Sequence, residues 1–202
     1  MTVLDTEASL RDCYDQPNEM VQKKILHRLD KHARAFIALS PFAVLATHGP
    51  DGSDASPRGD APGFVRVEDD TTLLLPDRRG NNLIDSLRNV VASPDVGLLF
   101  MVPGINETLR VNGTARVITD AARLQPMSAQ GKVPASALEI SVREVYFHCG
   151  KAMIRSDLWN AEKHVPRSSF PTLGRVIADQ VAGVDAEAAD VNLAESYKSR
   201  LY

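Results

Sequence analysis

The sequence predicts a mainly β protein with helices at both ends. Three observations support this fold class: short alternating apolar segments between residues 42 and 149, tight turns that join them, and a four-residue apolar repeat near the N-terminus. The chain has 202 residues, which suits one domain with appendages. Many antiparallel strands joined by short turns are typical of a barrel or a sandwich.

Composition excludes several classes of protein. The net charge of −3 argues against a nucleic-acid partner, which is normally bound by a basic surface. No apolar run approaches the roughly 18 residues of a membrane span. The first fifteen residues carry early acids and no apolar core, so we expect no secretory signal. With only Cys13 and Cys149 in the chain, a reducing compartment, by default the cytoplasm, is expected.

The N-terminal region predicts one amphipathic helix. Asn18 can cap its start, and Pro41 ends it. Apolar residues recur every four positions along one face. These residues are Val21, Ile25, Leu29, Ala33 and Ile37.

Residues 42–149 predict six or seven strands with one inserted helix at 82–91. The turn at 48–54 contains Asp51-Gly52, a hairpin signal, and Gly113 inside a strand indicates a bulge. Thr119-Asp120 caps a short helix, and residues 182–194 form a C-terminal helix. The expected extended segments are 42–47, 55–58, 64–67, 71–75, 96–102, 108–118 and 138–149.

The segment LLLPDRRGNN, residues 73–82, predicts an anion site. An apolar strand leads into Arg78 and Arg79, and a helix follows Asn81 and Asn82. A helix N-terminus offers unpaired N–H groups, guanidinium groups suit phosphate, and either Asn can cap the helix. The alternative is a surface turn with solvated arginines.

Two other segments are candidates for ligand contact. SPRGDAPGF, residues 56–64, could let the backbone approach a flat ligand, or it is an edge strand broken by proline. Trp159 could form an aromatic wall on a planar ligand, or it anchors the core or a dimer interface. His148 and Cys149 face opposite sides of a strand, so they do not predict a metal site, and a packed thiol is favoured for Cys149.

These segments together resemble the pyridoxamine 5′-phosphate oxidase-related FMN-binding split barrels, in particular a bacterial subgroup of these flavoproteins. The resemblance covers about residues 36–160. Its pieces come in the family's order, and the SYKSRLY tail is also similar. They are SPFAVLAT, HGPDGSDASPRGD, LLLPDRRGNNLIDSLRNVVASPDVGLLFMVPG, ETLRVNGTARV and REVYFHCGKAMIRSDLW.

The resemblance implies an antiparallel FMN-binding split β-barrel at 41–160, an N-terminal helical segment at 1–40 and a C-terminal helical extension at 161–202. It also implies a homodimer with FMN at the interface, and Lys151, Ser156 and Trp159 would come from the partner subunit. It assigns no catalytic residue and no metal. The implied cofactor-binding residues are Ser56, Arg58, Asp60, Pro76, Asp77, Arg78, Asn81, Asn82, Thr108, Lys151, Ser156 and Trp159.

The chain departs from the oxidases proper in two places. Those enzymes have Arg-Lys at the phosphate turn, where this chain has Asn81-Asn82, and their Arg-Leu-His type motif is absent from the tail. We therefore expect an FMN-dependent oxidoreductase acting on an unidentified small molecule, with NAD(P)H as a candidate reductant, and not pyridoxamine-phosphate oxidation. The alternative is a non-catalytic flavin- or haem-binding carrier or sensor.

Overall fold

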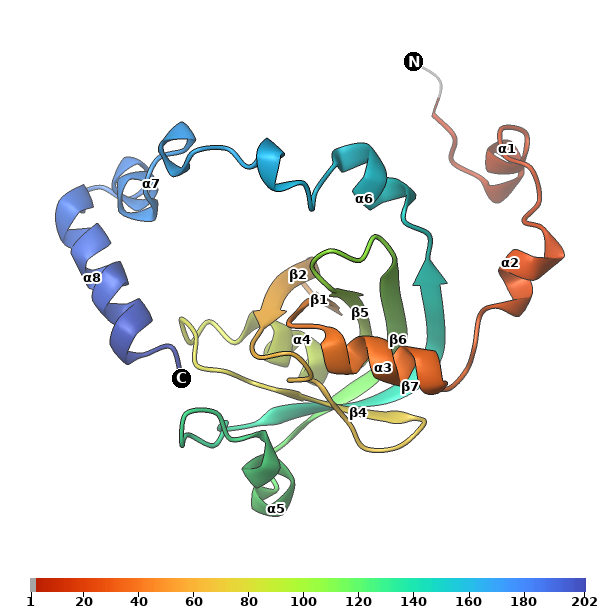
Figure 1. The fold of residues 1–202 in the computed structure, drawn as a ribbon, viewed down its shortest axis with the longest axis horizontal. Helices are drawn as coiled ribbons and strands as arrows, with labels where there is room; N and C mark the ends of the chain where they lie inside the picture. Colours follow the sequence, from red (N-terminus) through yellow and green to blue (C-terminus); the bar gives the residue numbers. More distant parts are fainter. Residues whose placement is uncertain (1–2) are drawn as a thin grey trace.

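The computed structural model describes residues 3–202 and contains one seven-stranded antiparallel sheet (Figure 1). The strand order is β2-β1-β5-β6-β7-β4-β3. This confirms the prediction of a mainly β fold with flanking helices. Residues 1 and 2 of the predicted N-terminal segment lie outside the described part. The strands are β1 Phe42–Gly49, β2 Gly52–Gly59, β3 Arg66–Val67, β4 Thr72–Pro76, β5 Asp95–Met101, β6 Thr108–Ile118 and β7 Ala137–His148.

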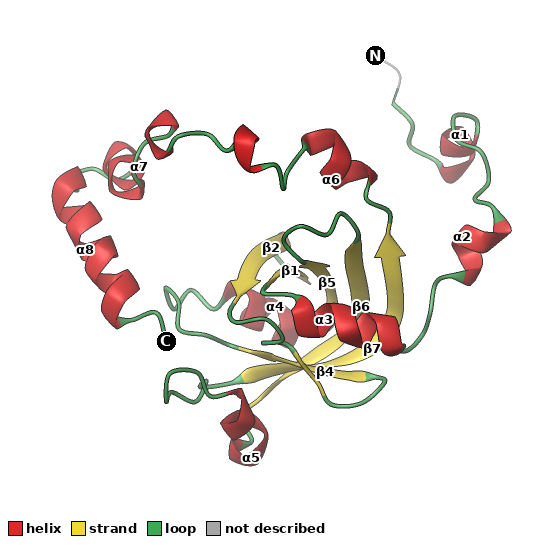
Figure 2. Cartoon of the chain, in the orientation of Figure 1, coloured by secondary structure: helices red, strands yellow, loops and turns green. Residues whose placement is uncertain are grey.

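Helices precede, interrupt and follow the sheet (Figure 2). Helix α4 lies against β1, and α3 contacts β3. No helix in the described residues is long and apolar enough to cross a membrane. The α-helices are α1 Glu7–Arg11, α2 Glu19–Lys23, α3 Lys31–Leu39, α4 Asp85–Ala92, α5 Ala121–Leu124, α6 Lys151–Ser156, α7 Leu173–Gln180 and α8 Ala186–Ser199, with short 3₁₀ turns at Gln125–Met127, Ala161–Lys163 and Arg167–Ser169.

Alternating burial along the strands builds the core. In β5, every second residue from Val96 to Phe100 is buried, as expected when one face of a strand packs inward. The inward residues of neighbouring strands meet in one apolar cluster. At about 25 cal/mol per Å² of apolar surface, this burial is the main favourable contribution to folding. Fully buried members include Leu45, Leu73, Leu98, Phe100, Leu109, Val111 and Ile140.

The predicted bulge in β6 is confirmed. The β6–β7 register shifts between Asn112 and Gly113, and a Cβ added to Gly113 would lie 2.1 Å from the carbonyl oxygen of Ser141. Only glycine allows the two backbones to approach so closely.

The prediction of one continuous N-terminal helix is wrong. The chain forms α2, leaves the helix, and pairs Leu26 with Val145 of β7 through two backbone hydrogen bonds of 3.0 and 2.7 Å. Asp30 then caps α3 by accepting from the N–H of Ala33 at 2.8 Å. A short isolated helix has little stability of its own. The two hydrogen bonds to β7 and the new helix cap at Asp30 therefore stabilise the interrupted form more than the apolar repeat stabilises one continuous helix.

After β7 the chain forms an arm of helices, residues 150–199, which arches away from the sheet and returns to it (Figure 1). Helices α7 and α8 pack on each other, and Asp190 accepts a hydrogen bond from Gly174 N–H at 2.8 Å. The predicted C-terminal helix is present but starts at Asp185, its cap. The three-part division at residues 40 and 160 stays a prediction.

Candidate functional site

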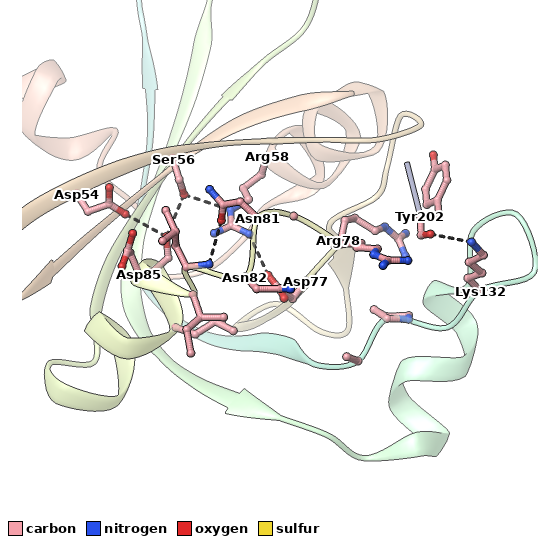
Figure 3. Close-up of a pocket in the computed structure, with 18 of the residues that line it drawn as sticks. Asp54, Ser56, Arg58, Asp77, Arg78, Asn81, Asn82, Asp85, Lys132 and Tyr202 are labelled. Carbon is pink, nitrogen blue, oxygen red and sulfur yellow. Dashed lines mark hydrogen bonds and ion pairs between the residues drawn. The ribbon is translucent and has the colours of Figure 1, made fainter. Parts of the chain in front are cut away.

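A pocket of about 620 Å³ lies between β2, the loop from β4 to α4 and the loop before β7 (Figure 3). This volume is within the usual range for small-molecule sites, about 300–1,000 Å³. Four cations and three carboxylates line it, so its interior is highly charged. These side chains are Arg58, Arg78, Arg79, Lys132, Asp54, Asp77 and Asp85.

Hydroxyl groups connect one end of the pocket to α4. Ser86, in the first turn of α4, is 4% exposed. Its hydroxyl donates to Asp54 at 3.1 Å and lies 3.1 Å from the hydroxyl of Ser56. Arg58 donates to Ser56 at 3.2 Å. Asp54, Ser56 and Arg58 are every second residue of β2, so all three side chains point to the same face of that strand.

Arg58 is also tied to the end of β4. Its Nη1 lies 3.1 Å from Oδ1 of Asp77, and both side chains are mostly buried. The N–H of Asp77 donates to the carbonyl of Ser136 at 2.9 Å, which continues the β4–β7 pairing by one residue. The sheet therefore fixes the position of this ion pair on the pocket wall.

Arg78 is engaged by other protein groups. Its Nε donates to Oδ2 of Asp60 at 2.6 Å, and its Nη1 donates to the carbonyl of Met127 at 2.8 Å. Burial raises the pKa of Asp60, but hydrogen bonds from Tyr202 and Ala61 N–H and the charge of Arg78 outweigh it, so the pKa of Asp60 is lowered. Asp60 is therefore a carboxylate near neutral pH and holds Arg78 in place.

Two pocket cations, Arg79 and Lys132, make no ion pair with an Asp or Glu side chain within the described residues. Arg79 is exposed and makes neither an ion pair nor a side-chain hydrogen bond there. Lys132 donates to the main-chain oxygen of Tyr202 at 2.9 Å. Arg79 is therefore the cation available to an incoming anion, whereas Lys132 is bonded to Tyr202.

The loop before α4 adopts an unusual backbone. Asn82 and Ile84 have φ values of 62° and 54°, a left-handed region that L-residues rarely occupy and that is strained for β-branched Ile84. The prediction that Asn81 or Asn82 caps the helix is wrong: the cap position is Ile84, and Asn81 accepts from Leu83 N–H at 3.0 Å. The first N–H groups of α4 thus have no side-chain cap.

The structure brings together half of the predicted site residues. Two more lie next to the pocket without lining it: Asp60 binds Arg78, and Pro76 is the last residue of β4, directly before Asp77. Six predicted residues line the pocket: Ser56, Arg58, Asp77, Arg78, Asn81 and Asn82.

Four predicted residues lie outside this pocket. Thr108, the first residue of β6, is buried and pairs with His148, the last residue of β7. Lys151 and Ser156 are exposed on α6, and Trp159 donates to the carbonyl of Ile105 at 2.9 Å. The contribution of the α6 region to a partner's site stays a prediction.

Among the polar and charged residues that line the pocket, sequence reasoning missed five: Asp54, Asp85, Ser86, Lys132 and Tyr202. The alternation of β2 could have found Asp54, since Ser56 and Arg58 had been predicted on the same face. Nothing local in the sequence indicates Lys132 or Tyr202, because both reach the pocket through tertiary contacts.

The family described as "Pyridoxamine 5′-phosphate oxidase" matches residues 29–149, more than half of the chain. The chain belongs to the pyridoxamine 5′-phosphate oxidase family. Its sheet is the split barrel of that family, and the matched range includes every strand and α4. No curated protein matches the chain.

Several solved structures are similar to this family member. HupZ of Group A Streptococcus is 20% identical, with a TM-score of 0.49, covering 59% of this chain and 93% of that one. A putative pyridoxamine 5′-phosphate oxidase of Lactobacillus delbrueckii is 20% identical, with a TM-score of 0.45, covering 60% and 99%. An F420 reductase is 20% identical, with a TM-score of 0.42, covering 59% of this chain and 98% of that one. At these values, the activities of those proteins do not carry over to this chain.

Proposed function

We propose that this protein is an FMN-dependent oxidoreductase of the pyridoxamine-phosphate-oxidase-like class that acts on a small molecule. The observation that carries the proposal is the charged pocket of about 620 Å³, where β2 meets the β4–α4 loop. Six residues that the family resemblance implies for FMN line it. Family membership and pocket position therefore support the same ligand.

The donors of the pocket fit a phosphate at its α4 end. Arg79 supplies a guanidinium without a carboxylate partner in the described chain, and Asn81 and Asn82 line the same pocket. The uncapped start of α4 adds free N–H groups. Arg78, whose Nε and Nη1 are already bonded, would chiefly position this loop and contact the phosphate through Nη2.

The β2 wall suits the rest of the cofactor. Ser56 and Arg58 present a hydroxyl and a guanidinium along the pocket, where they would contact the ribityl chain and the ring. Pro76 and Asp77 would contribute strand-end backbone to the ring. Bound FMN would supply the redox chemistry, while the protein holds and orients it and shapes the open ring face.

We further propose a homodimer with the flavin at the interface. Lys151, Ser156 and Trp159 do not line the pocket of their own chain, so they would complete the pocket of the second copy. Large apolar side chains exposed on α3, on α4 and in the loop before α4 support an interface; examples are Leu39, Leu83, Ile84 and Val91. Both cysteines are free thiols, in keeping with a reducing cytoplasm.

The test is an absorption spectrum of the purified protein, with any released cofactor identified after denaturation. Flavin bands with FMN released, before or after reconstitution, are the expected result. A protein that stays colourless after incubation with FMN would overturn the proposal.

Turnover separates an enzyme from a carrier. NADH and NADPH are mixed anaerobically with the FMN-loaded protein, and flavin bleaching is compared with that of free FMN. Faster bleaching on the protein supports an oxidoreductase that uses this reductant. Tight FMN binding, with no faster bleaching by either nucleotide and no turnover with a panel of small-molecule donors, would instead support a non-catalytic flavin carrier.

A further inference from the structure

The arm of residues 150–199 is joined to the sheet at its two ends. At its start, Trp159 donates to the carbonyl of Ile105. Three residues beyond its far end, Tyr202 contacts the pocket. Between residues 3 and 202, no other hydrogen bond or ion pair links residues 150–202 to the rest of the chain. Segments with so few contacts open at low free-energy cost.

Tyr202 makes three contacts at one end of the pocket (Figure 3). Its hydroxyl donates to Oδ1 of Asp60 at 2.7 Å. Its ring lies 5.6 Å from the guanidinium carbon of Arg78, which is a cation–π distance. Its main-chain oxygen accepts from Lys132 Nζ at 2.9 Å. Tyr202 therefore bridges the Asp60–Arg78 pair on one side of the pocket to Lys132 on the other.

These contacts involve the groups that organise the pocket. Asp60 binds Arg78 through one carboxylate oxygen and Tyr202 through the other. Lys132, which makes no ion pair with an Asp or Glu side chain in the described chain, is bonded to the same residue. Departure of Tyr202 would widen the pocket at this end and free Lys132 for a ligand.

We propose that residues 200–202, the closing segment, reversibly cover one end of the pocket through Tyr202 and limit the rate at which a ligand enters and leaves. The proposal rests on the proposed function only in the choice of FMN as the ligand. The closing segment acts by covering the site and by holding Arg78 through Asp60, so Tyr202 is a positioning residue.

The first experiment measures the rate of FMN release from the loaded full-length protein after dilution. Tyr202→Phe removes the hydroxyl contact and keeps the ring, and Tyr202→Ala removes both. We expect release to be a few-fold faster in Tyr202→Phe and about tenfold faster in Tyr202→Ala, since a hydrogen bond to a charged group and a cation–π contact are lost. Tyr197→Phe, on an exposed residue of α8, is the matched control and should release FMN at the wild-type rate.

The second experiment needs no ligand. Amide hydrogen exchange is measured in FMN-free wild type, Tyr202→Ala and Tyr197→Phe. Faster exchange at residues 60–63 and 127–132 in Tyr202→Ala alone supports closure by this segment, and it would do so even if wild type proved unable to bind FMN, which would overturn only the proposed function. Unchanged exchange in Tyr202→Ala, or release at the wild-type rate from a variant that binds FMN, would overturn the closing role.

Discussion

Arg78 and Asp60 form a mostly buried ion pair, with the guanidinium Nε 2.6 Å from Oδ2 and the two side chains 19% and 4% exposed. The residues belong to different loops, one after β2 and one after β4. The pair therefore joins the two segments that the sequence had indicated separately as ligand-binding. Because of this pair, Arg78 is held by protein groups, whereas Arg79 remains available to a ligand.

Arg79→Ala should weaken FMN binding without affecting the fold. Arg79 is exposed and has no ion-pair partner in the described chain, so its loss removes a phosphate contact and little else. We expect the dissociation constant to rise by about tenfold to a hundredfold and the Tm to stay unchanged, because a charge-assisted hydrogen bond contributes about 1.5–3 kcal/mol. FMN fluorescence titration and thermal unfolding check this. Equal FMN affinity in wild type and Arg79→Ala would count against this phosphate position.

Arg78→Ala should lower both stability and FMN retention. Removing the guanidinium leaves Asp60 mostly buried without its counter-ion, a loss of about 3 kcal/mol. The β4–α4 loop also loses its bond to Met127. Urea unfolding and FMN occupancy measure the two effects. A variant with wild-type stability would show that the ion pair does not hold this loop.

Acid should weaken the Asp60 contacts. The folded-state pKa of Asp60 is lowered, so its contribution to stability is fully present above its unfolded value, about 4, and is lost as pH falls through the folded value. The difference in unfolding free energy between wild type and Asp60→Asn should be constant from pH 7 to about pH 4 and shrink below that. Urea unfolding across this range tests the sign. A difference that grows on acidification would contradict the assignment.

Gly113→Ala should be strongly destabilising. The new Cβ would meet the Ser141 carbonyl oxygen, which is backbone and cannot rotate away. We expect a loss of about 2 kcal/mol or more, as in other overpacked sites. Gly80→Ala is the control for stability, because a Cβ there meets nothing within 4 Å. Similar Tm values for the two variants would argue against the close approach of β6 and β7.

Local signals were sufficient for most of the sheet. Alternating apolar residues and Gly- or Pro-containing turns placed β6 at its observed limits and β5 and β7 to within one residue, because a half-buried strand imposes a period of two on its own sequence. Gly113 also predicted the bulge from local sequence, because the close approach of two backbones requires a residue without a Cβ at that one position.

Local patterns in the sequence predicted most of the strands and the charged loops. The family resemblance implied that Arg58, Asp77, Arg78 and the two asparagines share one site; all five line one pocket, and their role in binding FMN stays a prediction. The point at which the N-terminal helix is interrupted depends on a long-range contact, since Leu26 bonds to Val145 of β7. Tertiary contacts also decide which arginine is held and which is available, and that Tyr202 closes the pocket. Those outcomes depend on contacts between residues 18 to 142 positions apart, and no local period in a sequence encodes such a contact.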